Sequence, residues 1–297
     1  MYYGFMNKTA LIVNTQASRV KKNLEDLKIA LENDEFENWD VHLIDEPSQL
    51  QSVIKKAGKS AQRIIIGGGD GTIATAIDTL DREKCDCEIG ILPLGTANYL
   101  ARNLNLPLDF KEALERASGN SSRAVYIAKA NGDSFFLMCA LGLTAAVSVH
   151  INVAFKQQFG QFAYVVELFR QLKKHDSFEY EITTDTRKTP LKGTSHQLVV
   201  VNAEINKQFS IAPESKLQSK KLQLNVYESQ HSKLKLLLSV MVYILTFGRI
   251  KRGFSSHEIE KATIKTSPKR EYSLDGEIKS ADRIDIVAGD HKVNIIC

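Results

Sequence analysis

Residues 63–72 read Arg-Ile-Ile-Ile-Gly-Gly-Gly-Asp-Gly-Thr, and this stretch decides how the chain folds. A β-branched run stops at three glycines, an acid, a fourth glycine and a threonine, and a small-residue helical pattern follows over 73–77. The pattern predicts a buried strand, a turn with a positive φ or a very close backbone approach, and a helix N-terminus capped by Thr72. Glycine amides at a helix start can bind an anion, so we interpret the turn as a phosphate cradle. An ordinary glycine-rich turn is the alternative interpretation.

The segments around this stretch alternate between strand and helix. We expect strands at 9–14, 39–44, 64–66 and 88–92, and helices running to residue 31, over 47–56 and over 73–80. This spacing is typical of βαβ units and a parallel sheet. Ligands of such sheets bind beyond the carboxyl ends of the strands, so Asn14 and the glycine loop are expected to lie along one edge.

A second loop follows the strand at 88–92. Residues 92–98 read Leu-Pro-Leu-Gly-Thr-Ala-Asn, and a helical pattern begins at Tyr99. Gly95 permits a close backbone approach, and Thr96 and Asn98 carry short hydrogen-bonding side chains at a helix start. The loop is either a simple helix cap or a second wall of the phosphate pocket, and its place on the same sheet edge favours the wall.

Composition sets the class of protein. The chain has 297 residues, 43% hydrophobic and 25% charged, which fits a globular protein of two domains or one large domain. The net charge of +4 is too small to indicate a nucleic-acid partner. Four cysteines lack metal-ligand spacing and are interpreted as free thiols in a reducing compartment. The first residues do not resemble a signal peptide, so we expect a cytoplasmic protein.

The pattern changes beyond about residue 123. Strand-like runs dominate there, separated by turn signals such as Asn131-Gly132-Asp133, and helical patterns of any length occur only near 160–174 and 232–247. We therefore predict two domains, an α/β domain over 1–128 and a mainly antiparallel β domain over 129–297.

The last chemical signal is Leu274-Asp275-Gly276-Glu277, two carboxylates around a glycine between strand-like runs. Asp-Gly is common in hairpin turns, and sequence physics alone favours that interpretation. A paired acid across a cleft from a phosphate loop would also suit a general base acting on a hydroxyl.

Taken together, the three motifs at 66–72, 92–98 and 274–277 resemble the diacylglycerol kinase catalytic family, which includes bacterial diacylglycerol kinases, YegS-like lipid kinases and sphingosine kinases. Ile12-Val13-Asn14 and the Ile211–Ser215 segment extend the resemblance over nearly the whole chain. The resemblance implies an N-terminal Rossmann-like α/β nucleotide-binding domain and a C-terminal mainly antiparallel β-sandwich, related to NAD kinases.

The resemblance also implies roles for particular residues. Asp275, Glu277 and Asp70 would be catalytic, Asp70 would act at the metal, and the cofactors would be ATP and Mg²⁺. The implied ATP-binding set comes from three loops: Asn14, Thr15, Gln16, Ala17, Ser18, Gly67, Gly68, Gly69, Asp70, Gly71, Thr72, Gly95, Thr96 and Asn98.

The chain departs from the family pattern at several carboxylates. Tyr99, Thr144, Ser219-Lys220 and Tyr126 stand where relatives usually carry Asp or Asp-Gly. Because Mg²⁺ prefers hard oxygen ligands, an accessory metal site is expected to be missing.

An apolar run over 236–247 is too short to cross a bilayer, and basic residues flank it: Lys233, Lys235, Arg249, Lys251 and Arg252. A buried helix is the simpler interpretation, and an interfacial helix attracted to anionic lipid is the alternative. The expected partners are a lipid substrate and a transient membrane surface, with a homodimer and peripheral contact at the inner membrane face left open.

The sequence thus predicts an ATP-dependent lipid kinase that phosphorylates a hydroxyl of diacylglycerol or a related lipid. Two alternatives stay open. One is an NAD-kinase-like small-molecule kinase, which the Asp-Gly-Glu motif disfavours. The other is a non-catalytic nucleotide- or lipid-binding homologue, which the missing carboxylates favour.

Overall fold

The computed structural model describes residues 8–20, 27, 29, 36, 38–150, 170–171, 176–202, 217, 219–227, 254–289 and 292–297. The chain forms two compact units. The first consists of Met1–Tyr126 with His291–Cys297, and the second of Ile127–Asp290.

The first unit is built on a six-stranded sheet with the order β2-β1-β3-β4-β16-β5. Its first five strands in that order run parallel, and β5 pairs antiparallel with β16 at the edge. The strands are β1 (Thr9–Asn14), β2 (Asp40–Ile44), β3 (Arg63–Gly68), β4 (Glu88–Pro93), β5 (Ser122–Tyr126) and β16 (Lys292–Ile296). The predicted α/β fold with a parallel sheet is confirmed.

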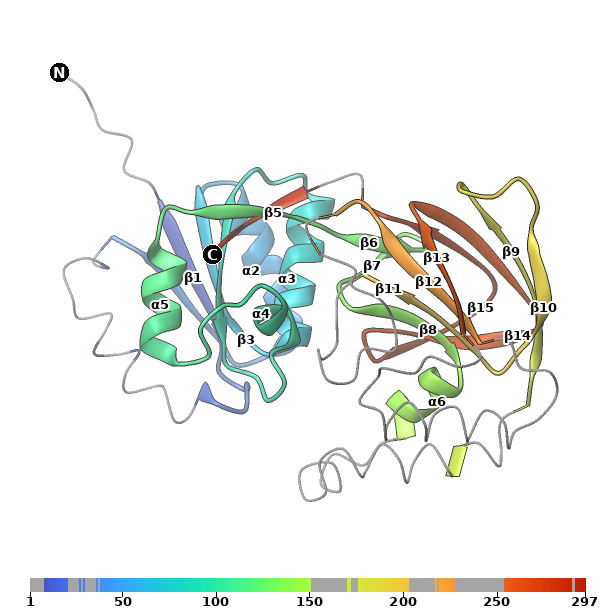
Figure 1. Ribbon diagram of the computed structural model, residues 1–297. Coiled ribbons are helices and arrows are strands. Elements are labelled where there is room, and N and C mark those ends of the chain that lie inside the picture. Colours follow the sequence, from blue (N-terminus) through green and yellow to red (C-terminus); the bar gives the residue numbers. More distant parts are fainter. Residues whose placement is uncertain are drawn as a thin grey trace. The chain divides into compact units, whose positions relative to one another are not determined.

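Helices cover both faces of this sheet (Figure 1), which is why its central strands are apolar throughout. Helix α5 (Phe110–Ser118) packs its buried Phe110 and Leu114 on one face. Helices α2 (Pro47–Gly58) and α3 (Asp70–Arg82) lie on the other, and the short α4 (Tyr99–Asn103) follows the second loop. Pro47 begins α2 at the position where proline's missing N–H costs nothing.

The last strand departs from the predicted division of the chain. Residues 129–297 were all expected in the β domain, but β16 lies between β4 and β5 in the sheet of the first unit. Ile295 pairs with Ile89 of β4 and with Arg123 of β5, and its side chain is fully buried. A strand of five residues carries no local signal of which sheet it will join, so this placement is decided by long-range pairing.

The second unit is a ten-stranded antiparallel sheet. The predicted mainly antiparallel β domain is confirmed, and hydrogen bonds link all ten strands. The strands are β6 (Ala128–Ala130), β7 (Asp133–Phe135), β8 (Met138–Gly142), β9 (Phe178–Thr184), β10 (Leu191–Ser195), β11 (Gln197–Val201), β12 (Leu222–Tyr227), β13 (Phe254–Ile259), β14 (Lys261–Leu274) and β15 (Glu277–Val287).

Alternating side chains of these strands form one core. In β9, Phe178, Tyr180 and Ile182 are buried while their neighbours are more exposed, as the period of two requires. The long strand β14 joins the sheet together, because it pairs with β15, with β8 and with β9 along its length. Helix α6 (Leu143–His150) directly follows β8.

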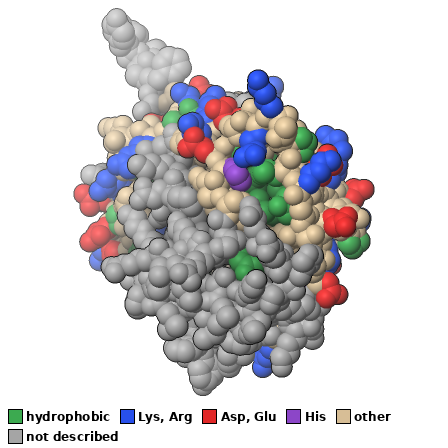
Figure 2. Space-filling model, turned by 45° about the vertical axis from the view of Figure 1, so that its right-hand side comes forward, with side chains coloured by type: hydrophobic (Ala, Val, Ile, Leu, Met, Phe, Trp, Pro, Cys, Tyr) green, Lys and Arg blue, Asp and Glu red, His purple; other side chains and the backbone are tan. Residues whose placement is uncertain are grey.

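Several predicted segments fall outside the described residues. These are the helix expected to reach residue 31 apart from a few positions, most of 160–174, the Ile211–Ser215 segment, and the apolar run over 236–247. Among the residues that are described, no helix is long and apolar enough to cross a membrane. On the face drawn in Figure 2, Lys and Arg side chains are interspersed with Asp and Glu.

Candidate functional site

The glycine motif connects β3 to α3. Gly67 and Gly68 still belong to β3, and helix α3 begins at Asp70 with Gly69 as its N-cap residue. The prediction that Thr72 caps the helix is therefore wrong: Thr72 lies inside the first turn, and its hydroxyl accepts a hydrogen bond from Asn14 Nδ2 at 2.9 Å. The helix thus starts directly at the strand end, which leaves its first N–H groups at the edge of the sheet.

The second loop lies against the first. A Cβ atom on Gly95 would come within 2.5 Å of Gly69 Cα, a distance that backbone atoms do not tolerate. Leu94 N also donates to Gly68 O at 2.9 Å. Gly95 is not among the glycines with a positive φ, so the close approach to Gly69 is the reason for glycine at position 95.

Asn98 holds the second loop in shape. It is fully buried with a φ of +51°, and its side chain accepts from Gly95 N and donates to the carbonyls of Pro93 and Gly95. Its amide is thus used within its own loop. Its place in the expected nucleotide-binding set is best understood as that of a positioning residue.

The loop after β1 completes this edge. Asn14 Oδ1 accepts from Gln16 N at 3.0 Å, and Ala17 N donates to Asn14 O. Ser18 Oγ lies 3.0 Å from Thr96 Oγ1, which joins the β1 loop to the second glycine loop. The predicted residues from 14–18, 67–72 and 95–98 are therefore brought together along the carboxyl ends of β1, β3 and β4.

Asp45 also lies at this edge, although the sequence did not predict it as a site residue. Thr15 Oγ1 lies 2.5 Å from Asp45 Oδ1 and 3.1 Å from Ile44 O, and Thr15 N donates to Ile44 O at 2.9 Å. Asp45 is exposed and directly follows β2. An acid immediately after a strand was the signal available, but a contact 30 residues away cannot be read from sequence.

Asp70 is the carboxylate of the glycine loop. It is half-buried at the first position of α3, and its Oδ1 accepts from Leu100 N at 3.3 Å. Within the described part of the chain, no group of three or more His, Cys, Asp or Glu side chains could hold a metal ion.

Asp275 and Glu277 belong to the second unit, at the hairpin between β14 and β15. Asp275 and Gly276 have φ angles of +50° and +105°, as a two-residue hairpin of the primed type requires. The Asp275 carboxylate accepts three backbone N–H groups, from Phe136 at 2.6 Å, Leu137 at 2.9 Å and Met138 at 2.8 Å. Glu277 is exposed at the start of β15. Both residues are exposed, and the Asp275 carboxylate is the one that the backbone N–H donors hold.

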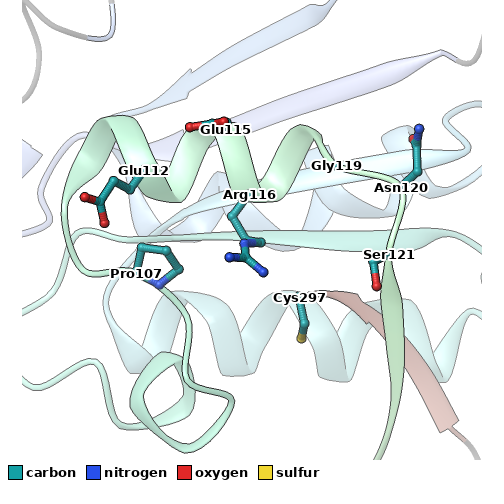
Figure 3. A pocket seen from close by; sticks show the side chains of 8 residues that line it. All are labelled: Pro107, Glu112, Glu115, Arg116, Gly119, Asn120, Ser121 and Cys297. Atoms are coloured by element: carbon teal, nitrogen blue, oxygen red, sulfur yellow. The ribbon is translucent and has the colours of Figure 1, made fainter.

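A hollow elsewhere in the first unit takes in none of the predicted site residues (Figure 3). Arg116 points into it from α5, and the end of β16 lies opposite. Burial raises the pKa of the Cys297 thiol there, while Arg123 and Arg116 act in the opposite direction. The lining residues are Pro107, Glu112, Glu115, Arg116, Gly119, Asn120, Ser121 and Cys297.

The fold and the loop edge define a class: proteins that pair an α/β unit, with glycine loops at the carboxyl ends of a parallel sheet, with an antiparallel β unit. Residues 8–130 match the family model described as "Diacylglycerol kinase catalytic domain". This part of the chain, about two fifths of its length, is therefore similar to the diacylglycerol kinase catalytic domain.

Individual relatives carry the names of lipid kinases. A protein from Staphylococcus haemolyticus whose assigned name is that of a lipid kinase is 27% identical over 72% of this chain and 70% of its own length. A Yersinia pestis protein named "Probable lipid kinase YegS-like" is 36% identical over 46% of this chain, and the match spans about half (47%) of that relative.

Solved structures share the fold. A crystal structure of a Bacillus anthracis protein assigned as a diacylglycerol kinase has a TM-score of 0.78, covers 98% of this chain and 97% of its own, and is 23% identical. A second, of "a diacylglycerol kinases from Bacillus anthracis", has a TM-score of 0.73 at 19% identity, with 98% and 96% covered.

Proposed function

We propose that the protein is an ATP-dependent lipid kinase that phosphorylates a hydroxyl of diacylglycerol or a related lipid. The observation that carries the proposal is the contact of Gly69 with Gly95 at the carboxyl edge of one parallel sheet, in a chain whose residues 8–130 match the diacylglycerol kinase catalytic domain. The names of the relatives from Staphylococcus and Yersinia support a lipid as the acceptor.

The residues at this edge fit a polyphosphate. A Cβ built on Gly71 meets no atom within 4 Å, so open space lies over the start of α3. The first N–H groups of a helix and its dipole favour a negative charge in that space. The hydroxyls of Ser18 and Thr96, which lie 3.0 Å apart, add neutral donors at the same sheet edge.

Asp70 supports the inclusion of Mg²⁺. A carboxylate next to a polyphosphate is repelled unless a cation lies between them. Mg²⁺ is commonly held in such sites by one or two carboxylates together with phosphates and water, so a single protein ligand is sufficient. Asp70 is the residue that would hold it, and the ion would neutralise phosphate charge when bound.

The reaction needs one proton acceptor. The lipid hydroxyl oxygen forms a bond to the terminal phosphorus of ATP, the bond from that phosphorus to the bridging oxygen breaks, and ADP leaves. The hydroxyl proton passes to a carboxylate, for which Asp275 and Glu277 are the candidates.

The decisive experiment incubates the protein with labelled ATP, Mg²⁺ and a total lipid extract and identifies the labelled product. We expect a phosphorylated lipid, and a loss of roughly 100-fold or more for Asp70→Asn because positioning and charge compensation carry phosphoryl transfer. Asp86→Asn changes an exposed acid outside the loops and serves as the matched control. Full activity of both Asp70→Asn and Asp275→Asn would refute the assignment.

Tyr99, Thr144 and Ser219, at positions where the family usually has acidic residues or an Asp-Gly pair, favour one alternative, a homologue that binds nucleotide without turnover. Tight ATP binding with no transfer to any lipid would establish it. Transfer to a water-soluble acceptor alone would instead identify an NAD-kinase-like enzyme.

A lipid substrate also requires contact with a membrane surface. The sequence over 233–252 supports this, because basic residues flank its apolar run. We expect co-sedimentation with vesicles that contain anionic lipid and weaker co-sedimentation with purely zwitterionic vesicles. Equal binding to both would remove the electrostatic part of this proposal.

A further inference from the structure

Strand β2 lies at one end of the first sheet, and within the described residues β1 is the strand that pairs with it. The other edge of β2 carries the backbone N–H and C=O groups that point away from β1. Four large hydrophobic side chains are exposed in the described part of the chain, and two of them, Val41 and Leu43, belong to this five-residue strand. Their exposed fractions are 37% and 50%.

Val41 and Leu43 extend the core of the first unit to its edge. In the register of the parallel pair, Val41 lies beside Leu11 and Leu43 lies beside Val13, and both β1 residues are fully buried. Because residues that are paired in register share one face of a sheet, the apolar layer that is covered at β1 is exposed at β2. An added strand that covers this layer would remove apolar area from water.

Other edge strands of the protein carry residues that discourage pairing. Natural sheet edges are protected by lysines and other charges, by prolines or by short length. At the opposite end of the first sheet, the exposed residues of β5 are Ser122 and Arg123. In the second unit, the exposed residues of β10 are Lys192 and Gly193. Strand β2 reads Asp-Val-His-Leu-Ile, and its two exposed positions are apolar.

We propose that β2 pairs with β2 of a second copy of this chain, antiparallel and centred on His42, to form a homodimer. A two-fold axis at His42 places Val41 opposite the partner's Leu43 and Leu43 opposite the partner's Val41, so each apolar side chain gains a cross-strand neighbour. The charges are also complementary. Asp40, whose Oδ1 lies 3.2 Å from His42 Nε2 of its own chain, is opposite the partner's Ile44 and diagonal to the partner's His42.

Sedimentation velocity of the full chain over a concentration series tests the dimer. One pair of five-residue strands offers less than the roughly 1,200 Å² of a standard interface, so we expect a weak dimer that forms at about 100 µM protein. Leu43→Lys places a charge on the edge of each copy and should weaken dimerisation by about tenfold or more. Ile278→Lys is the matched control, because Ile278 is 37% exposed but belongs to β15 of the second unit, and it should leave dimerisation unchanged.

Cysteine cross-linking with an added oxidant tests the register of the pair. Directly opposite residues of antiparallel strands have Cα atoms about 4.5–5.5 Å apart, which a disulfide can span, so His42→Cys should give a covalent dimer. Asp40→Cys is the control, because the two copies of that position are four residues apart along the strands, about 14 Å, and should not cross-link. The unmodified protein measures any cross-linking through the native thiols.

Thermal melting of the lysine variants establishes that they fold. A monomer at every concentration would overturn the proposal. A dimer that survives Leu43→Lys, an equal loss of the dimer in Leu43→Lys and Ile278→Lys, or equal cross-linking of the two cysteine variants would overturn it as well.

Discussion

Gly95 and Gly71 show how differently glycines of one site can be constrained. A side chain on Gly95 would collide with the backbone at Gly69, whereas a side chain on Gly71 would enter open space. The first glycine is needed by the folded chain itself. The second is needed only if a ligand occupies the space above it.

Gly95→Ala is therefore expected to destabilise the protein by roughly 1–3 kcal/mol, because the two loops must separate to admit a methyl group. Gly71→Ala should leave stability unchanged or slightly higher, since alanine is the better helix former, and should weaken ATP binding. Urea unfolding and ATP titration of both variants check this. Weaker nucleotide binding without a loss of stability in Gly71→Ala identifies the open space as the phosphate position.

Asp275 also stabilises the fold, apart from any catalytic role. Its carboxylate accepts from three consecutive backbone N–H groups, which end at Met138, the first residue of β8, over a separation of 137 to 139 residues. Asp275→Ala should cost about 1–2 kcal/mol, because these donors lose a charged acceptor.

Glu277→Ala is the comparison for this prediction, as Glu277 is exposed two residues away, and it should leave the unfolding midpoint unchanged. Chemical denaturation of the two variants measures the difference. Equal stability of both would mean that the three hydrogen bonds contribute nothing net.

Among the strands and helices, β16 has the largest effect on how the chain connects its two units. It fills the sheet of the first unit between β4 and β5, so the polypeptide leaves that unit at Tyr126 and returns at the end. The two units are thus connected by two crossings of the chain.

Ile295→Ala should cost about 2–5 kcal/mol, since the side chain is fully buried between two strands and its removal leaves a cavity. Asn294→Ala alters the neighbouring, partly exposed position of the same strand and should cost much less. Denaturant unfolding of both variants measures the two losses of stability. Similar values for both would contradict the central position of β16 in the sheet.

For the molecule as a whole, the reactivity of the cysteine thiols measures how well the cores of both units are packed. All four cysteines are free, and Cys87, Cys139 and Cys297 are buried while Cys85 is half-buried. Burial raises the pKa of Cys87 to about 12 and that of Cys139 even further. Because the thiolate is the reactive form, only about one Cys87 thiol in ten thousand is ionised at pH 8.

We expect alkylation of the folded protein at pH 8 to modify Cys85 first and the other three only after unfolding. Burial and the neighbouring Glu83 also raise the pKa of Cys85, so its own rate should increase as the pH rises. Mass spectrometry of timed samples, with and without urea, measures this order. Early modification of Cys139 would contradict the packed core of the second unit.

Much of the first unit could be predicted from sequence. The strands at 9–14, 88–92 and around 64–66, the helix from Pro47 and the glycine loops were all expected, because each depends on short-range patterns. The exact start of α3 was missed. The N-cap residue is Gly69 and not Thr72. The Thr72 hydroxyl instead bonds to Asn14, which is 58 residues away in the sequence and so cannot be identified from the local pattern.

The sequence by itself predicted the alternation of strand and helix, the identity of the loops and the resemblance to the diacylglycerol kinase catalytic family, because turn chemistry and hydrophobic periodicity are local. Only the tertiary structure decided that residues 292–296 join the first sheet, that Asp45 lies against Thr15, and that three backbone amides bind the Asp275 carboxylate. These outcomes depend on which strands become neighbours. Strand pairing over such separations is settled by packing the whole core, so no short stretch encodes it.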